Sequence, residues 1–455
     1  MATRRDACVA AAVAAAGSLA WALLRRRKAR SGVGVALPYR AACVYLDWNA
    51  TSPIFPEVTE AMLPFVGQHF GNPSSSHAFG VVCGDALSRA RAQVATLVGG
   101  TADEIVFCGC GSEADNLALR GVVLAEHARR RGARGDAALP HVICTNIEHP
   151  AVTACLRALE SEGLASFTPV PVDGDGLVAP AAVAAAVTPA TVLVTIMHSN
   201  NEVGSVQPLR AISSAVRAAA TAAGAPRAPL VHTDAAQSIG KVPVKAAELA
   251  VDLITIVGHK FGAPKGCAAL FVRAGVELKP IIHGGGQEHG LRAGTECVPL
   301  CVALGAAAAV VEAELPQISA HMLALRAHLY SLLARGLGEQ NVRVNGPARR
   351  ALDIEGAGAA AGLSDSLPNT LSIGLRGVKA ARVLAALNDS VAASASAACH
   401  TADVAKSSIS FVLRALDVPI EFAVGTLRLS VGRHTTRADI ERAAGLILSA
   451  AKAPQ

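Results

Sequence analysis

Short apolar, β-branched runs alternate with alanine-rich stretches from about residue 45 onward. Apolar runs of this length are typical of strands that are buried on both faces of a sheet. The stretches between them have helical patterns, so the chain predicts βαβ units and a mostly parallel sheet covered by helices on both faces. The expected strands are residues 104–107, 141–145, 191–197, 230–233 and 253–257, and the expected helices include 118–129, 151–161 and 209–222.

A second α/β unit is expected in the C-terminal part of the chain. A long helical stretch, 311–337, leads into the segments 370–374, 378–387 and 427–431. Because 455 residues exceed what one ordinary core holds, two domains are expected. We predict a leader and linker at 1–37, a large domain at 38–310, whose first residues are free to pack on the small domain, and a small C-terminal domain at 311–455.

The net charge of +6 comes from the start of the chain, because residues 1–30 hold seven basic residues against Asp6 alone. The rest of the chain is neutral and only 3% of all residues are aromatic, so no electrostatic feature favours nucleic-acid binding. Eleven cysteines without framework spacing indicate a reducing compartment. Cys108 and Cys110 lack a second pair of ligands at metal spacing, so no metal site is expected.

Residues 7–24 form an uncharged, alanine-rich run with arginines on both sides. Its length and flanks suit a marginal membrane span, and the heavier basic flank on its C-terminal side would keep the body of the protein on the cytoplasmic side. The Arg-rich, acid-poor composition also suits a mitochondrial leader. An inert extension is the third interpretation, and the sequence leaves all three open.

Polar groups follow the expected strands of the large domain. Lys260 ends one strand, where partial desolvation favours the neutral amine that bonds covalently to a cofactor. Asp234 closes another strand and can pair with a protonated pyridine nitrogen. Taken singly, Lys260 also fits a solvated lysine after a strand, and Asp234 also fits a helix N-cap. The strand-end groups, in chain order, are the turn Gly111-Ser112, which offers amides to a phosphate, then His149, Asn201, Asp234 with Gln237, and Lys260. Together they point to pyridoxal 5′-phosphate on a fold-type-I scaffold.

A second chemical centre is expected at Cys399. This cysteine lies in a loop of small residues, and His400 beside it would help to lower the pKa of its thiol. Arg428 is a candidate for binding a substrate carboxylate with its guanidinium group, although an edge-strand arginine is the competing interpretation.

At these residues the sequence resembles the cysteine desulfurase and selenocysteine lyase family of class V aminotransferase-like proteins. The resemblance runs from Tyr45-Leu46-Asp47 to Arg437. It implies a pyridoxal-phosphate-dependent α/β protein of fold type I, with a seven-stranded, mostly parallel sheet flanked by helices and a smaller α/β C-terminal domain that carries the catalytic cysteine loop. The turn at Cys110 departs from the family pattern, which has a small glycine there.

The resemblance also implies a role for each matching residue. For the cofactor, Gly111, Ser112 and His259 would contact the phosphate, His149 would stack on the ring and move protons, Asn201 and Gln237 would contact the ring hydroxyl, Asp234 the ring nitrogen, and Lys260 would bind covalently. For the substrate, Cys399 would be catalytic, and Arg428 and Asn49 would bind the amino acid. Thr295 would reach the phosphate in the partner subunit, which implies a homodimer.

Within the family the stretch Ala397-Ala398-Cys399-His400-Thr401 is more similar to selenocysteine lyases, because desulfurases usually have Ser-Ala-Cys-Thr. We therefore expect L-selenocysteine as substrate. Three alternatives stay open: a cysteine desulfurase that passes persulfide sulfur from Cys399 to an acceptor protein, a class V transaminase that needs no such cysteine, and a membrane-tethered scaffold without turnover.

Overall fold

Seven strands form the large sheet, in the order β2-β8-β7-β6-β5-β3-β4. The computed structural model describes residues 43–130, 138–348, 365–387, 389–395 and 409–453. The strands are β2 (Ile105–Cys108), β3 (His141–Thr145), β4 (Ser166–Val170), β5 (Thr191–Thr195), β6 (Leu230–Asp234), β7 (Leu253–Val257) and β8 (Ala268–Val272). Strand β8 is antiparallel to β2 and β7, and the other neighbouring pairs are parallel. The expected α/β fold with a mostly parallel sheet is therefore confirmed.

Three expected strands differ from the structure in their ends: β2 is shifted by one residue, β5 ends two residues earlier and β6 ends one residue later. Residue Glu104 belongs to a short turn, because its carboxylate accepts the backbone N–H of Thr101 in a capping box, and β2 starts one residue later. Strand β5 ends at Thr195, although Ile196 and His198 still donate backbone hydrogen bonds to strand β6. Strands β4 and β8 were not expected, because one is a partly exposed edge strand and the other begins with two alanines.

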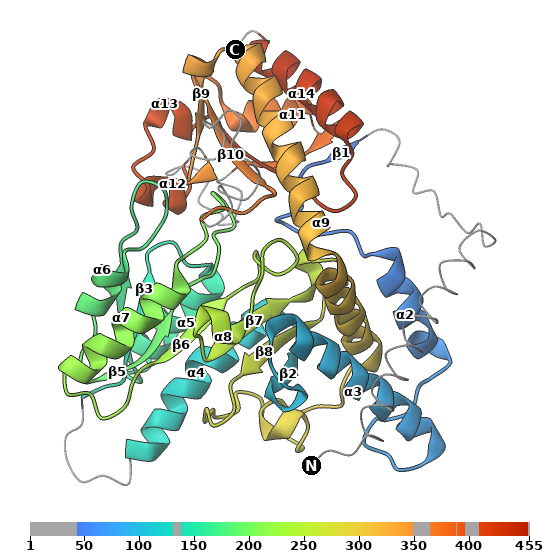
Figure 1. Ribbon diagram of the computed structural model, residues 1–455, viewed down its shortest axis with the longest axis vertical. Coiled ribbons are helices and arrows are strands. Elements are labelled where there is room, and N and C mark those ends of the chain that lie inside the picture. Colours follow the sequence, from blue (N-terminus) through green and yellow to red (C-terminus); the bar gives the residue numbers. More distant parts are fainter. Residues whose placement is uncertain (1–42, 131–137, 349–364, 388, 396–408, 454–455) are drawn as a thin grey trace, which may run out of the picture. The chain divides into compact units, whose positions relative to one another are not determined.

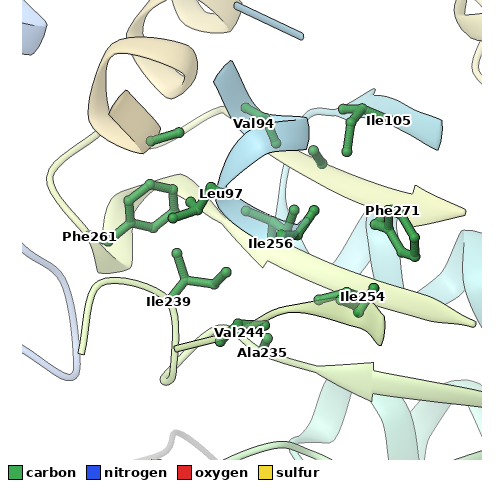
Figure 2. Close-up of a cluster of buried hydrophobic side chains, with 14 of the residues drawn as sticks. Val94, Leu97, Ile105, Ala235, Ile239, Val244, Ile254, Ile256, Phe261 and Phe271 are labelled. Atoms are coloured by element: carbon green, nitrogen blue, oxygen red, sulfur yellow. The ribbon is translucent and has the colours of Figure 1, made fainter. Parts of the chain in front are cut away.

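Helices cover both faces of the large sheet (Figure 1). The helices of this part are α2 (Pro56–Gly67), α3 (Ala78–Val98), α4 (Gly111–Arg130), α5 (Pro150–Ser161), α6 (Pro180–Ala185), α7 (Leu209–Ala222) and α8 (Ala246–Leu249). Helices α4 and α5 pack on one face and α3 and α7 on the other. Figure 2 shows part of the hydrophobic core between the sheet and the helices of the second face, where Val94 and Leu97 of α3 lie beside Ile254 and Ile256 of β7.

A smaller sheet forms the C-terminal part of the described chain. Its order is β12-β13-β10-β9, all antiparallel, and β1 and β11 form a separate parallel pair. The elements are β1 (Val44–Tyr45), β9 (Val342–Val344), β10 (Thr370–Leu375), α11 (Ala380–Leu387), β11 (Val391–Ala392), β12 (Ser394–Ala395), α12 (Phe411–Ala415), α13 (Ile420–Ala423), β13 (Thr426–Ser430) and α14 (Arg437–Lys452). Val44 and Leu46, which lie near the start of the described chain, pack in the hydrophobic core of this smaller sheet.

Helix α9 (Val298–Leu337) joins the two hydrophobic clusters. Its residues from Cys301 to Val311 lie in the core of the large sheet, and those from Ile318 to Leu333 lie in the core of the small sheet. In the part of the chain that the structure describes, α9 is the one helix long and apolar enough to cross a bilayer, but its buried side chains make it a core helix. The domain limits expected from the sequence stay predictions.

A buried ion pair holds the loop before α9 against the large sheet. Glu288 accepts two hydrogen bonds of 2.6 Å from Arg91 and one of 2.7 Å from the backbone N–H of Phe107. Glu288 and His289 both have left-handed backbones, with φ of 49° and 58°. Non-glycine residues adopt this conformation at a cost, so the ion pair must hold the loop in place.

We therefore expect Glu288→Ala to lower the free energy of unfolding by about 3–5 kcal/mol, because the Arg91 guanidinium stays buried without its partner. The measurement is the urea unfolding midpoint of the cofactor-free protein. Glu162→Ala is the matched control, since it breaks a similar pair with Arg120 at the surface and should leave the midpoint unchanged. Equal midpoints for the two variants would contradict the structural role of Glu288.

Candidate active site

The polar groups expected at the strand ends meet along one edge of the large sheet. The chain leaves β3, β5, β6 and β7 at this edge because these strands are parallel. His149 is the N-cap of helix α5 after β3, Asn201 lies in the turn after β5, and Asp234 is the last residue of β6. Lys260 ends a short 3-10 helix, η2 (Gly258–Lys260), which follows β7. Parallel α/β sheets bind their ligands at this edge.

The amine of Lys260 is held by backbone oxygen atoms. Its Nζ donates hydrogen bonds to the carbonyls of Asn49, at 2.8 Å, and Ala50, at 2.9 Å. The next residue, Phe261, is buried in the core beneath the sheet edge (Figure 2). The lysine is therefore anchored at its backbone, and its amine is kept at the edge of the sheet by the turn that follows β1.

Asp234, His149 and Lys260 lie close enough for their charges to interact: Asp234 and Lys260 act on the pKa of His149, and His149 and Lys260 act on that of Asp234. Burial raises the pKa of Asp234, and the N–H of Ala236, 2.9 Å from Oδ1, opposes this increase. Burial lowers the pKa of His149, so its ring is neutral at neutral pH. Its Nδ1 accepts the N–H of Ala151 at 3.1 Å, which leaves the ring proton on Nε2.

Gln237, Asn201 and His259 lie next to this group. The side chain of Gln237 donates from Nε2 to the carbonyl of Asn49 at 3.0 Å. The carbonyl of Asn201 accepts from the Asn49 side chain at 3.2 Å. His259 Nδ1 lies 3.1 Å from the hydroxyl of Thr51, and burial lowers the pKa of this histidine to about 4. All three were expected near the cofactor, and their individual contacts with it stay predictions.

The expected phosphate turn starts helix α4 at Gly111 and Ser112. A Cβ atom at Gly111 would lie only 2.6 Å from Val257 Cγ2, so a larger residue does not fit without movement of that side chain. Cys110 is exposed, and its carbonyl accepts the N–H of Ala114, so the departure from the family pattern does not prevent the helix start. The first amides of a 20-residue helix suit an anion.

Glu113 ties this turn to the loop that carries Thr295. Its carboxylate accepts from the backbone N–H of Gly109 at 2.9 Å and from Arg292 Nε at 2.9 Å. Thr295 follows Arg292 by three residues and is exposed. Its expected contact with the phosphate of a partner subunit stays a prediction.

Arg428 was expected to bind the substrate carboxylate, and this role stays a prediction. The residue lies on β13, where its Nη2 donates to Asp47 Oδ1 at 2.8 Å and its Nη1 to the carbonyl of Asn201 at 3.2 Å. Within the described residues its buried Nε has no hydrogen-bond partner. A buried N–H without an acceptor is costly, so a substrate carboxylate would be stabilised at this atom.

The chain that leads to Cys399 starts beside Arg428. Ser394 of β12 is paired with Arg428 of β13, and its hydroxyl donates to Asp47 Oδ2 at 3.0 Å. Cys399 and His400 themselves lie outside the described residues.

Asn49 was expected to contact the substrate, but both polar atoms of its side chain are hydrogen-bonded within the protein. Its Nδ2 donates to the carbonyl of Asn201 and, at 2.8 Å, to Thr370 Oγ1. Its Oδ1 accepts from Asn369 Nδ2 at 2.9 Å. The residue is 1% exposed, so the expected substrate contact stays a prediction that would compete with three existing hydrogen bonds.

Sequence reasoning missed Glu148, which precedes His149. Its carboxyl is fully buried and accepts from Thr145 Oγ1 at 2.6 Å and from the N–H of Met197 at 3.1 Å. Burial raises its pKa to about 8, and the charge of Asp234 adds to the increase. An acidic residue three positions after a wholly buried strand was the only signal in the sequence.

The groups at this edge fit a flat, phosphorylated pyridine aldehyde. Lys260 offers an amine for the aldehyde, Asp234 a buried carboxyl for the ring nitrogen, His149 a neutral ring, and the start of α4 offers amides for the phosphate. In the described part of the chain, no three His, Cys, Asp or Glu side chains are placed to hold a metal ion.

Comparison with known proteins agrees with this geometry. The profile of the family Aminotransferase class-V matches residues 44–443. A cysteine desulfurase of Trichormus azollae is 38% identical over 400 residues, 88% of this chain and 90% of the relative. A selenocysteine lyase of Bos taurus is 39% identical over 434 residues, 92% of this chain and 95% of the relative. A solved structure titled NifS-like protein superposes with a TM-score of 0.76 at 31% identity, covering 90% of this chain and 98% of that one.

The chain therefore belongs to the class V aminotransferase family. This membership confirms the expected cofactor, pyridoxal 5′-phosphate, and the expected fold type I. The relatives carry the names of two different activities, so the substrate is a separate question.

Glu148→Gln should change how stability depends on pH. In the folded protein the pKa of Glu148 is about 8, whereas the carboxyl of an unfolded chain titrates at about 4.3. Between these values the folded state holds a proton that the unfolded state has released, so wild-type stability falls as pH rises. Glutamine does not titrate, so the variant should gain on the order of 3 kcal/mol over the wild type between pH 5 and pH 8.

Urea unfolding midpoints of the cofactor-free protein at both pH values measure this gain. Glu60→Gln, at an exposed position, is the control and should follow the wild type. A Glu148→Gln protein whose stability ran parallel to the wild type at both pH values would rule out the buried, protonated carboxyl.

Proposed function

We propose that the chain is a homodimeric selenocysteine lyase that converts L-selenocysteine and a reductant into L-alanine and selenide. Its coarser class, a pyridoxal-phosphate-dependent lyase of carbon–sulfur or carbon–selenium bonds, is common to the desulfurases and lyases that it resembles. The observation that carries the proposal is the grouping of Lys260, Asp234 and His149 around one space at the sheet edge.

When bound, pyridoxal phosphate supplies an electron sink for the charge that develops on the substrate's α-carbon. Lys260 would hold the cofactor and, once the substrate amine has replaced it, take the α-proton at its Nζ. The buried carboxylate of Asp234 would keep the proton on the ring nitrogen. His149, neutral and with its proton on Nε2, would lie over the ring and move protons. Arg428 would bind the substrate carboxylate through Nε.

Cys399 is the residue on which the choice of selenium or sulfur would depend. It would either give a proton to the γ-atom of the substrate or take selenium from it. A selenol is more acidic than a thiol and is largely anionic at neutral pH, so it needs less help from the protein to react. The sequence Ala398-Cys399-His400, which is similar to that of selenocysteine lyases, supports selenium as the preferred element.

The nearest alternative is a cysteine desulfurase that keeps sulfur on Cys399 for an acceptor protein. Alanine release from L-selenocysteine and from L-cysteine, at equal concentration and with the same reductant, separates the two functions. We expect strong preference for L-selenocysteine, with Lys260→Ala inactive on both. Comparable turnover of both amino acids, with labelled sulfur retained on Cys399, would replace the lyase with a desulfurase.

The second copy in the proposed homodimer would cover an apolar patch formed by α2, the start of α3 and the loop between them. Its members include Leu63, Val66, Phe70 and Phe79. Phe70 and Phe79 are 75% and 61% exposed, and their ring centres lie 5.4 Å apart. Exposed apolar clusters of this kind mark interfaces. A dimer would also allow Thr295 to reach the neighbouring site.

Replacing both Phe70 and Phe79 by Asp should therefore give a monomer that loses cofactor faster than the wild type on dialysis. Light scattering gives the oligomeric state, and the visible absorbance of the dialysed protein gives the retained cofactor. Ile420→Asp is the control, because Ile420 is 68% exposed on α13 and lies outside the patch. If the double variant stayed dimeric, the patch would not be the interface.

A further inference from the structure

Lys241 is a buried amine that none of the roles above uses. It is 4% exposed and follows Gln237 by four residues in the turn after β6. Its Nζ donates a hydrogen bond of 2.8 Å to the backbone carbonyl of Gln237 and lies 3.4 Å from the side-chain Oε1 of the same residue. Both of its described hydrogen-bond acceptors therefore belong to Gln237.

Lys241 also lies close to Lys260. The two lysines line one small cavity of about 20 Å³, together with Trp48, Met322 and Arg433. Burial lowers the pKa of Lys241 to about 7, and the charge of Lys260 adds to the decrease.

The other charged and titratable groups around this cavity are already engaged. Arg433 is paired with Glu57 and Glu314. His259 is neutral at neutral pH, because burial lowers its pKa to about 4. The charges of Lys260, Lys265 and Lys241 add smaller decreases, in that order. The amine of Lys241, whose pKa burial lowers to about 7, therefore changes charge near neutral pH.

The hydrogen bonds around Gln237 decide which way its amide points. A protonated lysine only donates, so the charged form of Lys241 faces the Oε1 end of the amide and not the Nε2 end. The Nε2 end accordingly donates to the carbonyl of Asn49 at 3.0 Å. A primary amide has two N–H bonds, so one donor is left for a further acceptor. The expected acceptor is the ring hydroxyl oxygen of the cofactor.

We propose that Lys241 is a positioning residue that holds the Gln237 amide with Nε2 toward the cofactor and places a second amine beside Lys260. This inference rests on the role proposed for Lys260 and on the contact with the ring hydroxyl that the family resemblance implies for Gln237. Without Lys241 the amide of Gln237 can turn over and present an oxygen to the ring oxygen, which would be repulsive. The neighbouring positive charge disfavours a proton on the nitrogen that joins Lys260 to the cofactor.

The test uses the cofactor-loaded protein with Lys241→Met and Lys241→Arg. The first readout is the pH midpoint at which the visible absorbance band titrates, and the second is cofactor retention on dialysis. Lys241→Met removes both the cation and the donor, so its midpoint should rise by about one pH unit. Its retention should be roughly 10-fold weaker, as expected for one lost hydrogen bond to the ring.

Lys241→Arg should behave in the opposite way. Arginine keeps a donor and stays charged at every working pH, so the midpoint should stay at the wild-type value or fall. The matched control is Lys265→Met, which removes an exposed lysine whose charge also acts on His259 and should change neither readout. This split between two variants at one position is not expected from a lysine that only fills space.

A wild-type midpoint in Lys241→Met, or an equal increase in both variants, would overturn the inference. If Lys241→Met does not fold, Lys241→Arg decides alone, because an increased midpoint in that variant contradicts the role of the charge. Loss of the visible band in the wild type would instead reject the proposed function itself, and the inference with it.

Discussion

The candidate site depends on the hydrogen bonds that meet at Asn49. Its backbone carbonyl accepts from Lys260 and from Gln237, which belong to the turns after β7 and β6. Its side chain binds Asn369 and Thr370, at the start of β10 in the small sheet. A single residue after the first strand of the body thus connects two turns of the large sheet to the small sheet. Loss of these bonds would leave several buried polar groups without partners, which is costly in a dry interior.

Burial rather than ion pairing sets most protonation states at the sheet edge. It lowers the pKa values of His149 and His259 and raises those of Asp234 and Glu148. The histidines are therefore neutral, and Glu148 takes up a proton that a solvated carboxyl would release. Under these conditions a bound cofactor with a charged ring nitrogen would be the partner that favours an ionised Asp234. Arg428 lies on β13, which is paired on both sides in the small sheet, so the edge-strand interpretation is wrong, and an ion pair of 2.8 Å joins it to Asp47.

Local sequence pattern was enough to predict the strands that lead to Asp234 and Lys260, because alternating apolar runs and helical stretches indicate a parallel sheet covered by helices. The same pattern places both residues at one edge. It did not predict β8, whose alanine-rich sequence has little strand preference, or the role of Asn49, whose partner Asn369 is 320 residues away. Lys241 and Glu148 were missed because no sequence motif marks their contacts. Lys241 donates to Gln237, and Glu148 accepts from the buried hydroxyl of Thr145.

Chemical trapping of the cofactor tests the central claim most directly. The cofactor-loaded protein would be reduced with borohydride, digested, and its peptides identified by mass spectrometry. We predict a phosphopyridoxyl group on Lys260 and none on Lys241, although both lysines line the same small cavity. A label on Lys241 or Lys265, or no label on any lysine, would contradict this prediction.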